Sequence, residues 1–183
     1  MEVVPVKGLL FDVAREVVAE VLGEDEWDRA VEAADVEGAY TSLGNYPDAE
    51  MVRLVDVIAA TAGLTRDEAL RTVGVHGYRH LASRHPELVD GIDDVGALLH
   101  SLNAVIHPEV LKLYPESNVP SFDVVDVAED RWQVTYDSRR GLCRLAEGLI
   151  VGGGESLGRT TTVTHLSCVH DGDGTCVLEV TAG

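Results

Sequence analysis

The period of the hydrophobic pattern changes once along this chain, near Pro120, and this change restricts the fold more than any other feature. Before Pro120, apolar residues recur at the three- and four-residue spacing of amphipathic helices. One of these helices covers residues 7–22, and another starts at a capping box formed by Thr65 and Glu68. After Pro120 the pattern alternates with a period of two, which is typical of strands with one buried face. The sequence therefore predicts helices first and a sheet afterwards.

The C-terminal part is expected to contain four strands and one helix. The expected strands are residues 122–127, 132–136, 160–169 and 175–180. An apolar helix over residues 142–150 separates the two strand pairs and ends in three glycines, residues 152–154. The predicted fold class is α+β, with a helical N-terminal lobe followed by a four-stranded antiparallel sheet and one packed helix. At 183 residues and 45% apolar composition, the chain can form one compact domain or two tightly joined lobes.

The segment Ile-His-Pro-Glu-Val-Leu-Lys-Leu-Tyr-Pro, residues 106–115, places one imidazole at the start of a short helix. Pro108 suits the first helical position, where its missing N–H costs nothing. The apolar residues of the segment surround His107 at helical spacing. A single histidine near apolar residues is usually structural, so this segment alone does not define a site.

A second segment, Tyr-Asp-Ser-Arg-Arg, covers residues 136–140. Its alternation predicts a continuing strand, with Tyr136, Ser138 and Arg140 on one face. Two hydroxyls and a guanidinium would make a poor core. They would bind a pair of carboxylates well, because arginine donates in a bidentate fork and hydroxyls add neutral donors.

The two segments together resemble the H-NOX family, the haem-nitric oxide/oxygen binding domains, of the bacterial stand-alone type. The family pairs a histidine in an H-P-E-V-x-K-L-Y-P context with a Y-x-S-x-R motif, and both occur here in that order. The resemblance extends from Lys7 to about Val180. It implies a single domain, residues 1–183, with haem between a distal helical lobe (about 1–65) and a proximal lobe (about 66–183).

The resemblance implies a set of haem contacts. His107 would be the axial ligand, and Tyr136, Ser138 and Arg140 would bind the propionates. Pro120 and Leu10 would lean on the porphyrin. The haem would be non-covalent haem b, because the sequence has no C-x-x-C-H motif. A single protein ligand leaves the sixth iron position open for a diatomic gas.

The resemblance also implies which gas binds. Oxygen-binding members place a tyrosine donor on the helix after Y-x-S-x-R, whereas this chain has Leu145 there. Ala14 and Gly77 occupy the positions of the usual polar supporters. An apolar pocket of this kind favours nitric oxide, with carbon monoxide as a further ligand, and binds little or no oxygen. Tyr78 is an alternative donor if its hydroxyl turns inward.

Gly74 and Gly77 interrupt a helical pattern. A glycine there permits close approach by a flat ligand or by a neighbouring helix. The family resemblance favours the ligand, and the sequence alone leaves both interpretations open.

All three cysteines of the chain lie in its C-terminal part: Cys143, Cys168 and Cys176. With His165, three residues before Cys168, they form a donor set typical of a tetrahedral structural zinc site. Some H-NOX members carry a zinc site with this order and spacing. The alternatives are three buried thiols near a surface histidine, or a zinc site whose thiolates react with oxidants.

The composition excludes several function classes. The formal net charge of −18 argues against nucleic acid and anionic membranes as partners. No apolar run is long enough to span a bilayer, and residues 1–5 do not resemble a signal peptide. An odd number of cysteines does not form a secreted disulfide framework. We therefore expect a cytoplasmic protein.

Three functions compete. The favoured one is a non-enzymatic haem sensor of nitric oxide whose output lies in a separate chain; by resemblance, the partner would be a histidine kinase or a cyclic-di-GMP enzyme. The alternative is a haem-free, zinc-stabilised small-ligand or redox regulatory domain, similar to vinyl-reductase-like modules. A haem enzyme is least favoured, because the sequence shows no distal His–Arg pair placed to cleave an O–O bond.

Overall fold

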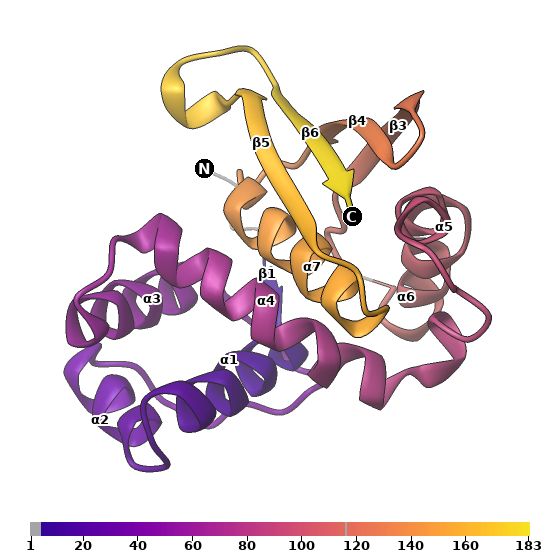
Figure 1. The fold of residues 1–183 in the computed structure, drawn as a ribbon. Helices are drawn as coiled ribbons and strands as arrows, with labels where there is room; N and C mark the ends of the chain where they lie inside the picture. Colours follow the sequence, from indigo (N-terminus) through magenta and orange to yellow (C-terminus); the bar gives the residue numbers. More distant parts are fainter. Residues whose placement is uncertain (1–4, 116) are drawn as a thin grey trace.

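The computed structural model describes residues 5–115 and 117–183 and confirms an α+β fold (Figure 1). The N-terminal elements are β1 (Pro5–Lys7), α1 (Gly8–Val21), α2 (Glu26–Ala33), β2 (Asn45–Pro47), α3 (Asp48–Ala62) and α4 (Arg66–Arg84). The C-terminal elements are η1 (Pro86–Leu88), α5 (Val95–Ser101), η2 (Leu102–Ile106), α6 (His107–Leu113), β3 (Ser121–Ala128), β4 (Arg131–Asp137), α7 (Cys143–Ser156), β5 (Thr161–Ser167), η3 (Val169–Asp171) and β6 (Cys176–Ala182). Residues 1–4, to which the signal-peptide expectation applies, lie outside the described residues.

The predicted four-stranded antiparallel sheet is confirmed, with strand order β3-β4-β6-β5. In the centre of the sheet, Val134 pairs with Leu178 and Tyr136 pairs with Cys176. All four side chains are buried. They face α7, which crosses beneath the sheet (Figure 1). The period of two after Pro120 thus marks one buried face, as expected.

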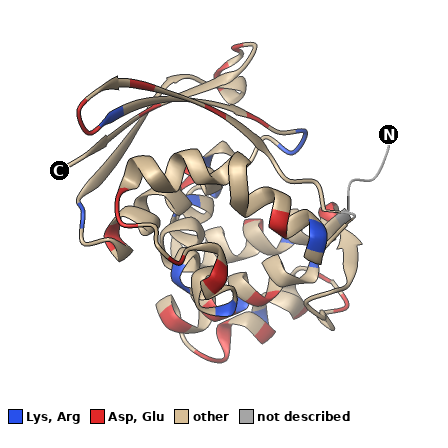
Figure 2. Ribbon diagram, turned by 90° about the vertical axis from the view of Figure 1, so that its right-hand side faces the viewer, with Lys and Arg blue, Asp and Glu red and all other residues tan. Residues whose placement is uncertain are grey.

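A second apolar core lies between α1, α2 and α3, and its fully buried residues include Phe11 and Leu54. The short strands β1 and β2, which the sequence analysis did not predict, pair antiparallel beside it. The capping box at the start of α4 is confirmed, because Thr65 and Glu68 each bond the other's backbone N–H. Asp and Glu residues are spread over both parts of the chain, with Lys and Arg interspersed (Figure 2). Among the described helices, none is long and apolar enough to cross a membrane.

Helix α7 does not end at the glycines of residues 152–154, as the sequence suggested, but continues to Ser156. These glycines allow close packing instead. A Cβ on Gly152 would overlap the backbone oxygen of Val75, and a Cβ on Gly154 would overlap Thr161. Gly148 faces the backbone of Arg71 and Gly74 in the same way. The close packing of α4 against α7 therefore requires glycine at these positions, because a side chain would not fit.

Replacing Gly148 with alanine should destabilise the fold by about 1–3 kcal/mol, the usual cost of overpacking. The added Cβ would overlap the Arg71 carbonyl oxygen, and backbone cannot rotate away as a side chain can. Denaturant unfolding of both proteins measures the difference. The matched control is Gly174→Ala, where a Cβ meets nothing within 4 Å. If Gly148→Ala were as stable as the wild type, α4 and α7 could move apart to accommodate a Cβ without a loss of stability.

Candidate functional site

His107 is the first residue of α6, as predicted, but α6 does not start from a loop: it continues directly from the preceding helical segment. Helices α5 and α6 are joined by a π-helical turn, η2, in which the His107 N–H donates to the Leu102 carbonyl five residues earlier. Pro108 explains the wide turn, because in a regular α-helix its ring would clash with the carbonyl four residues before it. Single π-turns are frequent at functional sites.

The imidazole of His107 lies in an apolar environment. Its ring centroid is 5.6 Å from that of Phe122, which in turn is 5.4 Å from that of Tyr136. Burial lowers the pKa of His107, and the backbone carbonyl of Pro120 partly opposes the shift. The ring is therefore neutral at pH 7, the form that binds metals. Among the described residues, Nδ1 of His107 is buried without a hydrogen-bond partner.

Asn103 is a site residue that the sequence analysis missed. It lies in η2 and forms a two-way hydrogen bond with the backbone of Phe122, donating to its carbonyl and accepting from its N–H. This pair fixes the π-turn to the first strand of the sheet, next to His107. A polar residue in an otherwise apolar helical run was the only signal for it.

The prediction that Tyr136, Ser138 and Arg140 share one strand is wrong. Strand β4 ends at Asp137, and Ser138 and Arg140 lie in the turn before α7. This turn is closed by the Arg140 N–H, which donates to Ser138 Oγ at 3.2 Å, and by Gly141 with φ +60°. The three side chains nevertheless line the same cavity. The turn after β4 thus brings together the three side chains that a continuous strand was expected to align.

These polar groups respond to their burial. Burial raises the pKa of Tyr136 to about 12, although the Ser138 hydroxyl opposes the shift. Burial lowers the pKa of the Arg140 guanidinium, and the negative charge of Asp48 opposes it. A half-buried cation next to neutral hydroxyl donors favours an anionic group nearby, because the low dielectric strengthens the attraction.

The cavity that these residues line has a volume of about 280 Å³. Leu10, Tyr78, Leu81, Leu145 and Leu149 come from the N-terminal helices and α7, and most of the lining is apolar. His107, Pro120 and Phe122 line it from the C-terminal part. The cavity therefore lies between the two parts of the chain, and His107 and Arg140 are among its few polar lining residues.

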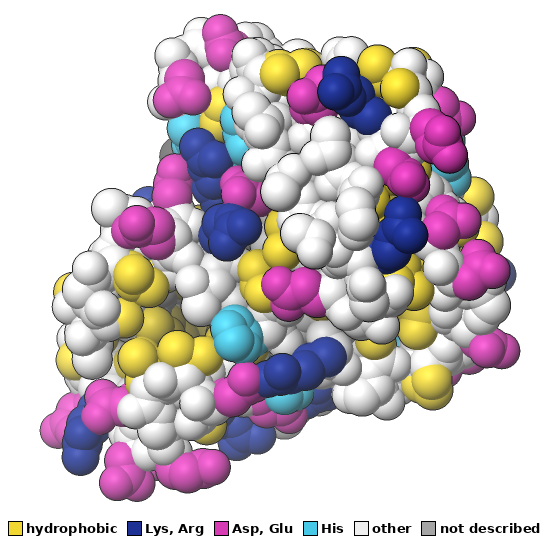
Figure 3. Space-filling model, in the orientation of Figure 1, with side chains coloured by type: hydrophobic (Ala, Val, Ile, Leu, Met, Phe, Trp, Pro, Cys, Tyr) yellow, Lys and Arg dark blue, Asp and Glu magenta, His cyan; other side chains and the backbone are white. Residues whose placement is uncertain are grey.

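A smaller cavity of about 70 Å³ adjoins the first and shares several lining residues with it, including Leu10 and Leu145. Ala14 lines this smaller cavity, between α1, α3 and α4. Figure 3 shows hydrophobic side chains in a hollow bordered by α2, α3 and α4. The distal side expected from the sequence is thus apolar around both Leu145 and Ala14.

Tyr78 lines the large cavity with its ring, which packs over Gly152 and Gly153 of α7. Its hydroxyl lies beside Ser156, and burial raises its pKa while Ser156 opposes the shift. Ser156 is three helical turns from Leu145, a distance of roughly 16 Å along the axis. The hydroxyl of Tyr78 is therefore occupied far from the position where a distal donor was considered.

Gly77 does not take the place expected for it. Among the described residues it is absent from the lining of both cavities, and a Cβ there would meet Val13 of α1. Gly74 likewise faces the backbone of α7. Of the two interpretations that the sequence left open, the structure shows close helix packing.

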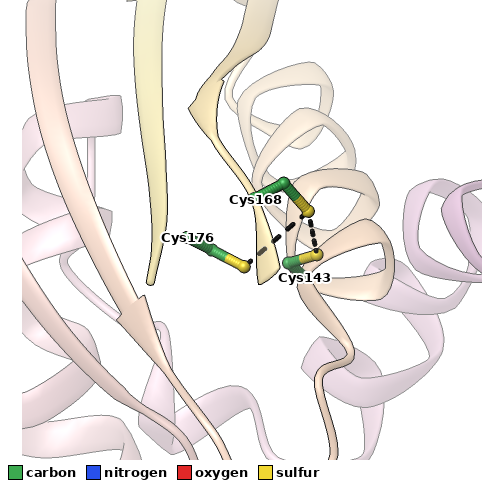
Figure 4. A group of neighbouring side chains, drawn as sticks. All are labelled: Cys143, Cys168 and Cys176. Carbon is green, nitrogen blue, oxygen red and sulfur yellow. Dashed lines mark hydrogen bonds between the residues drawn. The ribbon is translucent and has the colours of Figure 1, made fainter. Parts of the chain in front are cut away.

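The three cysteines converge, with their Sγ atoms all within 4.8 Å of one another and fully buried (Figure 4). The distances are 3.6 Å between Cys143 and Cys168, and 3.9 Å between Cys168 and Cys176. They come from the start of α7, the end of β5 and the start of β6. Burial raises the pKa of the Cys143 thiol. Three thiols this close can bind one metal ion.

His165, the fourth expected zinc ligand, does not join the cysteine group in this structure. Its Nε2 lies 3.0 Å from Glu147 Oε2 instead. Burial lowers the pKa of His165, and the charge of Arg144 lowers it further. Burial would raise the pKa of Glu147, but its hydrogen-bonding partners outweigh burial and the pKa is lowered. Glu147 was missed, because nothing in the sequence distinguishes it from a surface glutamate.

Two further residues of the large cavity were also missed. His85 lines it at the end of α4, and its Nε2 lies 3.5 Å from the hydroxyl of Tyr114. Asn118 lines it as well, and its Nδ2 is buried with no partner in the described part of the chain. His76 and His80 contact carboxylates of α1 on a partly exposed face.

The fold and the site define a class before any comparison. This is an α+β domain with an apolar cavity that is lined by a half-buried, neutral histidine and by a cation with two hydroxyls. Such a site suits a largely apolar ligand that carries acidic groups and a metal.

Comparison with known proteins gives the family. The Haem-NO-binding (HNOB) family model matches residues 7–165. The chain therefore belongs to the Haem-NO-binding, or H-NOX, family, whose members are haem-based gas sensors rather than catalysts. A search of curated proteins found no match.

Several solved structures share the fold. An H-NOX protein from Shewanella oneidensis, a triple mutant in the Fe(II) state, is 28% identical with a TM-score of 0.92, covering 97% of this chain and 96% of that one. The same organism's protein in the Fe(II)NO state gives 28% identity, a TM-score of 0.90 and coverage of 97% and 99%. An oxygen-binding H-NOX domain related to soluble guanylate cyclases has a TM-score of 0.81 at 19% identity, with coverage of 97% and 95%. That last likeness concerns the fold alone.

Proposed function

We propose that this protein is a haem-based sensor of nitric oxide, with non-covalent haem b and His107 as the axial ligand. The observation that carries the proposal is the neutral, half-buried imidazole in the cavity wall, whose buried Nδ1 has no partner among the described residues. A buried polar atom without a partner costs about 1–3 kcal/mol. Such a ring is expected to have a ligand, and the Haem-NO-binding match indicates haem iron.

The polar cluster at the edge of the cavity fits the haem propionates. Arg140 would pair with one carboxylate, while Tyr136 and Ser138 supply neutral donors. The raised pKa of Tyr136 keeps its hydroxyl protonated and able to donate. Pro120 and Leu10 both line the cavity and would contact the flat faces of the group. The domain would then divide into a distal lobe, about residues 1–65, and a proximal lobe, about residues 66–183.

The distal side supports nitric oxide, with carbon monoxide as a further ligand, over oxygen. Bound oxygen is strongly polarised and needs a hydrogen-bond donor, whereas nitric oxide needs one much less. Leu145 and Ala14 are apolar, and the hydroxyl of Tyr78 lies beside Ser156. The haem, when bound, supplies an open iron position, and this chain surrounds it with hydrocarbon.

The output of the sensor would lie in a separate chain, a histidine kinase or a cyclic-di-GMP enzyme, in the cytoplasm. His107 would hold the haem iron, and binding of a gas that weakens this hold would release His107. His107 begins α6 and ends the π-turn that Asn103 fixes to the sheet. Residues 102–113 therefore form the segment that such a release would move.

The proposal is tested by absorption spectra of the purified, reduced protein under argon, in air and with nitric oxide. We expect a haem band that shifts with nitric oxide and does not shift in air. A colourless protein after haem reconstitution would favour the haem-free regulatory module, which the family match does not favour. A shift in air would contradict the apolar distal pocket.

We also propose zinc as a structural cofactor at the cysteine cluster. Three buried Sγ atoms within 4.8 Å of one another support it, because cysteine thiolates are common ligands of structural zinc. Metal analysis of the purified protein tests it, with one zinc per chain expected. Removal of that zinc by a chelator should lower the midpoint of thermal unfolding, because a structural metal contributes to folding.

A further inference from the structure

The turn that carries Ser138 and Arg140 is tied to a segment that the proposed functions leave unused. This segment is η3, in the hairpin between β5 and β6. Nε2 of its residue His170 lies 2.7 Å from the backbone carbonyl oxygen of Gly141, at the end of the turn. A carbonyl oxygen can only accept a hydrogen bond, so Nε2 carries a proton and donates it. The hairpin thus holds the turn from 29 residues away along the chain.

The bond from His170 is shorter than two bonds within the turn itself. The Arg140 N–H donates to Ser138 Oγ at 3.2 Å, and the Gly141 N–H donates to the Ser138 carbonyl at 3.3 Å. Gly141 has φ +60°, a conformation that residues with a Cβ rarely adopt. The imidazole also packs on this glycine, because a Cβ added there would lie 3.5 Å from two atoms of the ring. The turn is therefore held from outside as well as from within.

The carbonyl that His170 holds is one end of a peptide unit whose other end is the N–H of Leu142. The unit is trans, so the two groups lie in one plane and point in opposite directions. Burial raises the pKa of Tyr136 to about 12, and the Ser138 hydroxyl and the Leu142 backbone oppose the rise. Both groups thus donate toward the Tyr136 oxygen. The hydroxyl keeps its own proton for an acceptor in the cavity.

We propose that His170 is a positioning residue for the haem site. It holds the Gly141 carbonyl, which orients the next N–H toward Tyr136 and fixes the turn that carries Arg140. The propionates of haem then meet donors that are already in place. This inference deepens the proposed haem function and rests on it. Because Nε2 donates from the neutral and from the protonated imidazole, the bond does not depend on the charge of His170.

The test is the rate at which the full-length protein loses haem to an excess of apomyoglobin. His170→Ala removes the donor and should weaken haem binding about 2- to 10-fold, the usual effect of one hydrogen bond, with correspondingly faster loss. His170→Gln, whose amide N–H reaches about as far as Nε2, should restore the wild-type rate. His100→Ala is the matched control, because His100 is also an exposed histidine and its partner is Asp126 of β3. It should lose haem as the wild type does.

Haem dimethyl ester provides a readout that a merely structural role would not change. Its propionates are esterified, so it offers iron to His107 but no charged carboxylate to Arg140. His170→Ala and the wild type should therefore release the ester at the same rate. A general loss of stability would instead speed the release of haem and of the ester alike. Thermal unfolding of the haem-free variants measures such a loss directly.

The possible failures are distinguishable. Wild-type release of haem by His170→Ala would overturn the role of His170, and so would faster release of haem and ester alike. A His170→Gln variant as fast as His170→Ala would overturn the Nε2 donor as the cause. A wild type that holds haem and its ester equally well would overturn the propionate contacts and this inference, but not the bond to His107. A wild type that binds no haem would overturn the proposed function as well.

Discussion

Replacing His107 with glycine should remove the axial bond to haem, and haem retention should then depend on added imidazole. Without imidazole, we expect the haem content after purification to fall at least about tenfold, a loss of ~1.4 kcal/mol or more. The physical reason is that the rest of the cavity offers mainly hydrocarbon, together with the propionate contacts that we propose for Tyr136, Ser138 and Arg140. Free imidazole can enter the space that the side chain leaves and restore the absorption band. Nitric oxide should then displace the imidazole without altering α6, which circular dichroism and limited proteolysis can follow.

His85 provides a matched control for His107, because both histidines line the same cavity. His85 lies beside the hydroxyl of Tyr114, at the end of α4. The variant His85→Ala should therefore retain haem and its response to nitric oxide. If His85→Ala lost haem while His107→Gly retained it without imidazole, the axial ligand would be His85. A nitric oxide response of α6 that persisted in His107→Gly would contradict signal transmission through His107.

The fold class could be predicted because the hydrophobic pattern has two periods. The first is that of a helix with one buried face, and the second is that of a strand with one buried face. Val134, Tyr136 and Leu178 alternate with more exposed residues along β4 and β6, and that pattern is local. Short strands such as β1 and β2 carry too few residues for a period to be recognised. Element bounds were less accurate where glycine was involved. Gly152 looks like a helix end by propensity, but tertiary packing against α4 overrides that preference.

The residues of the candidate site could be predicted where their side-chain types alone indicate a binding role. His107 and the polar residues after β4 have an unusual composition that sequence reasoning can detect. What the sequence could not show was conformation. The π-turn before His107 is tied to β3 by a bond from Asn103, and the residues after β4 turn through a bond between Arg140 and Ser138 where a continuing strand was expected. The contact between Glu147 and His165 spans 18 residues and joins two elements, α7 and β5, and no local pattern encodes it.

Leu145→Tyr should give the protein a measurable affinity for oxygen, which we propose that the wild type lacks. Leu145 lines both cavities, so a tyrosine there would place a hydroxyl in the distal space. A hydrogen bond to a strongly polarised ligand is worth about 1.5–3 kcal/mol. This corresponds to about 10- to 150-fold in the dissociation constant for oxygen. Nitric oxide affinity should change far less, because nitric oxide gains little from a donor. Absorption spectra during an oxygen titration measure the first effect, and stopped-flow dissociation measures the second.

Leu145→Phe separates the hydroxyl from the ring. It adds nearly the same volume without a donor, so it should remain as insensitive to oxygen as the wild type. If the phenylalanine variant gained oxygen affinity equal to that of the tyrosine variant, the size of the pocket would decide selectivity and its polarity would not. If the wild type itself bound oxygen, Tyr78→Phe would identify the donor: loss of oxygen binding would show that the Tyr78 hydroxyl leaves Ser156 and turns into the cavity. Unchanged spectra in Tyr78→Phe, together with a gain in Leu145→Tyr, are what the geometry around Ser156 leads us to expect.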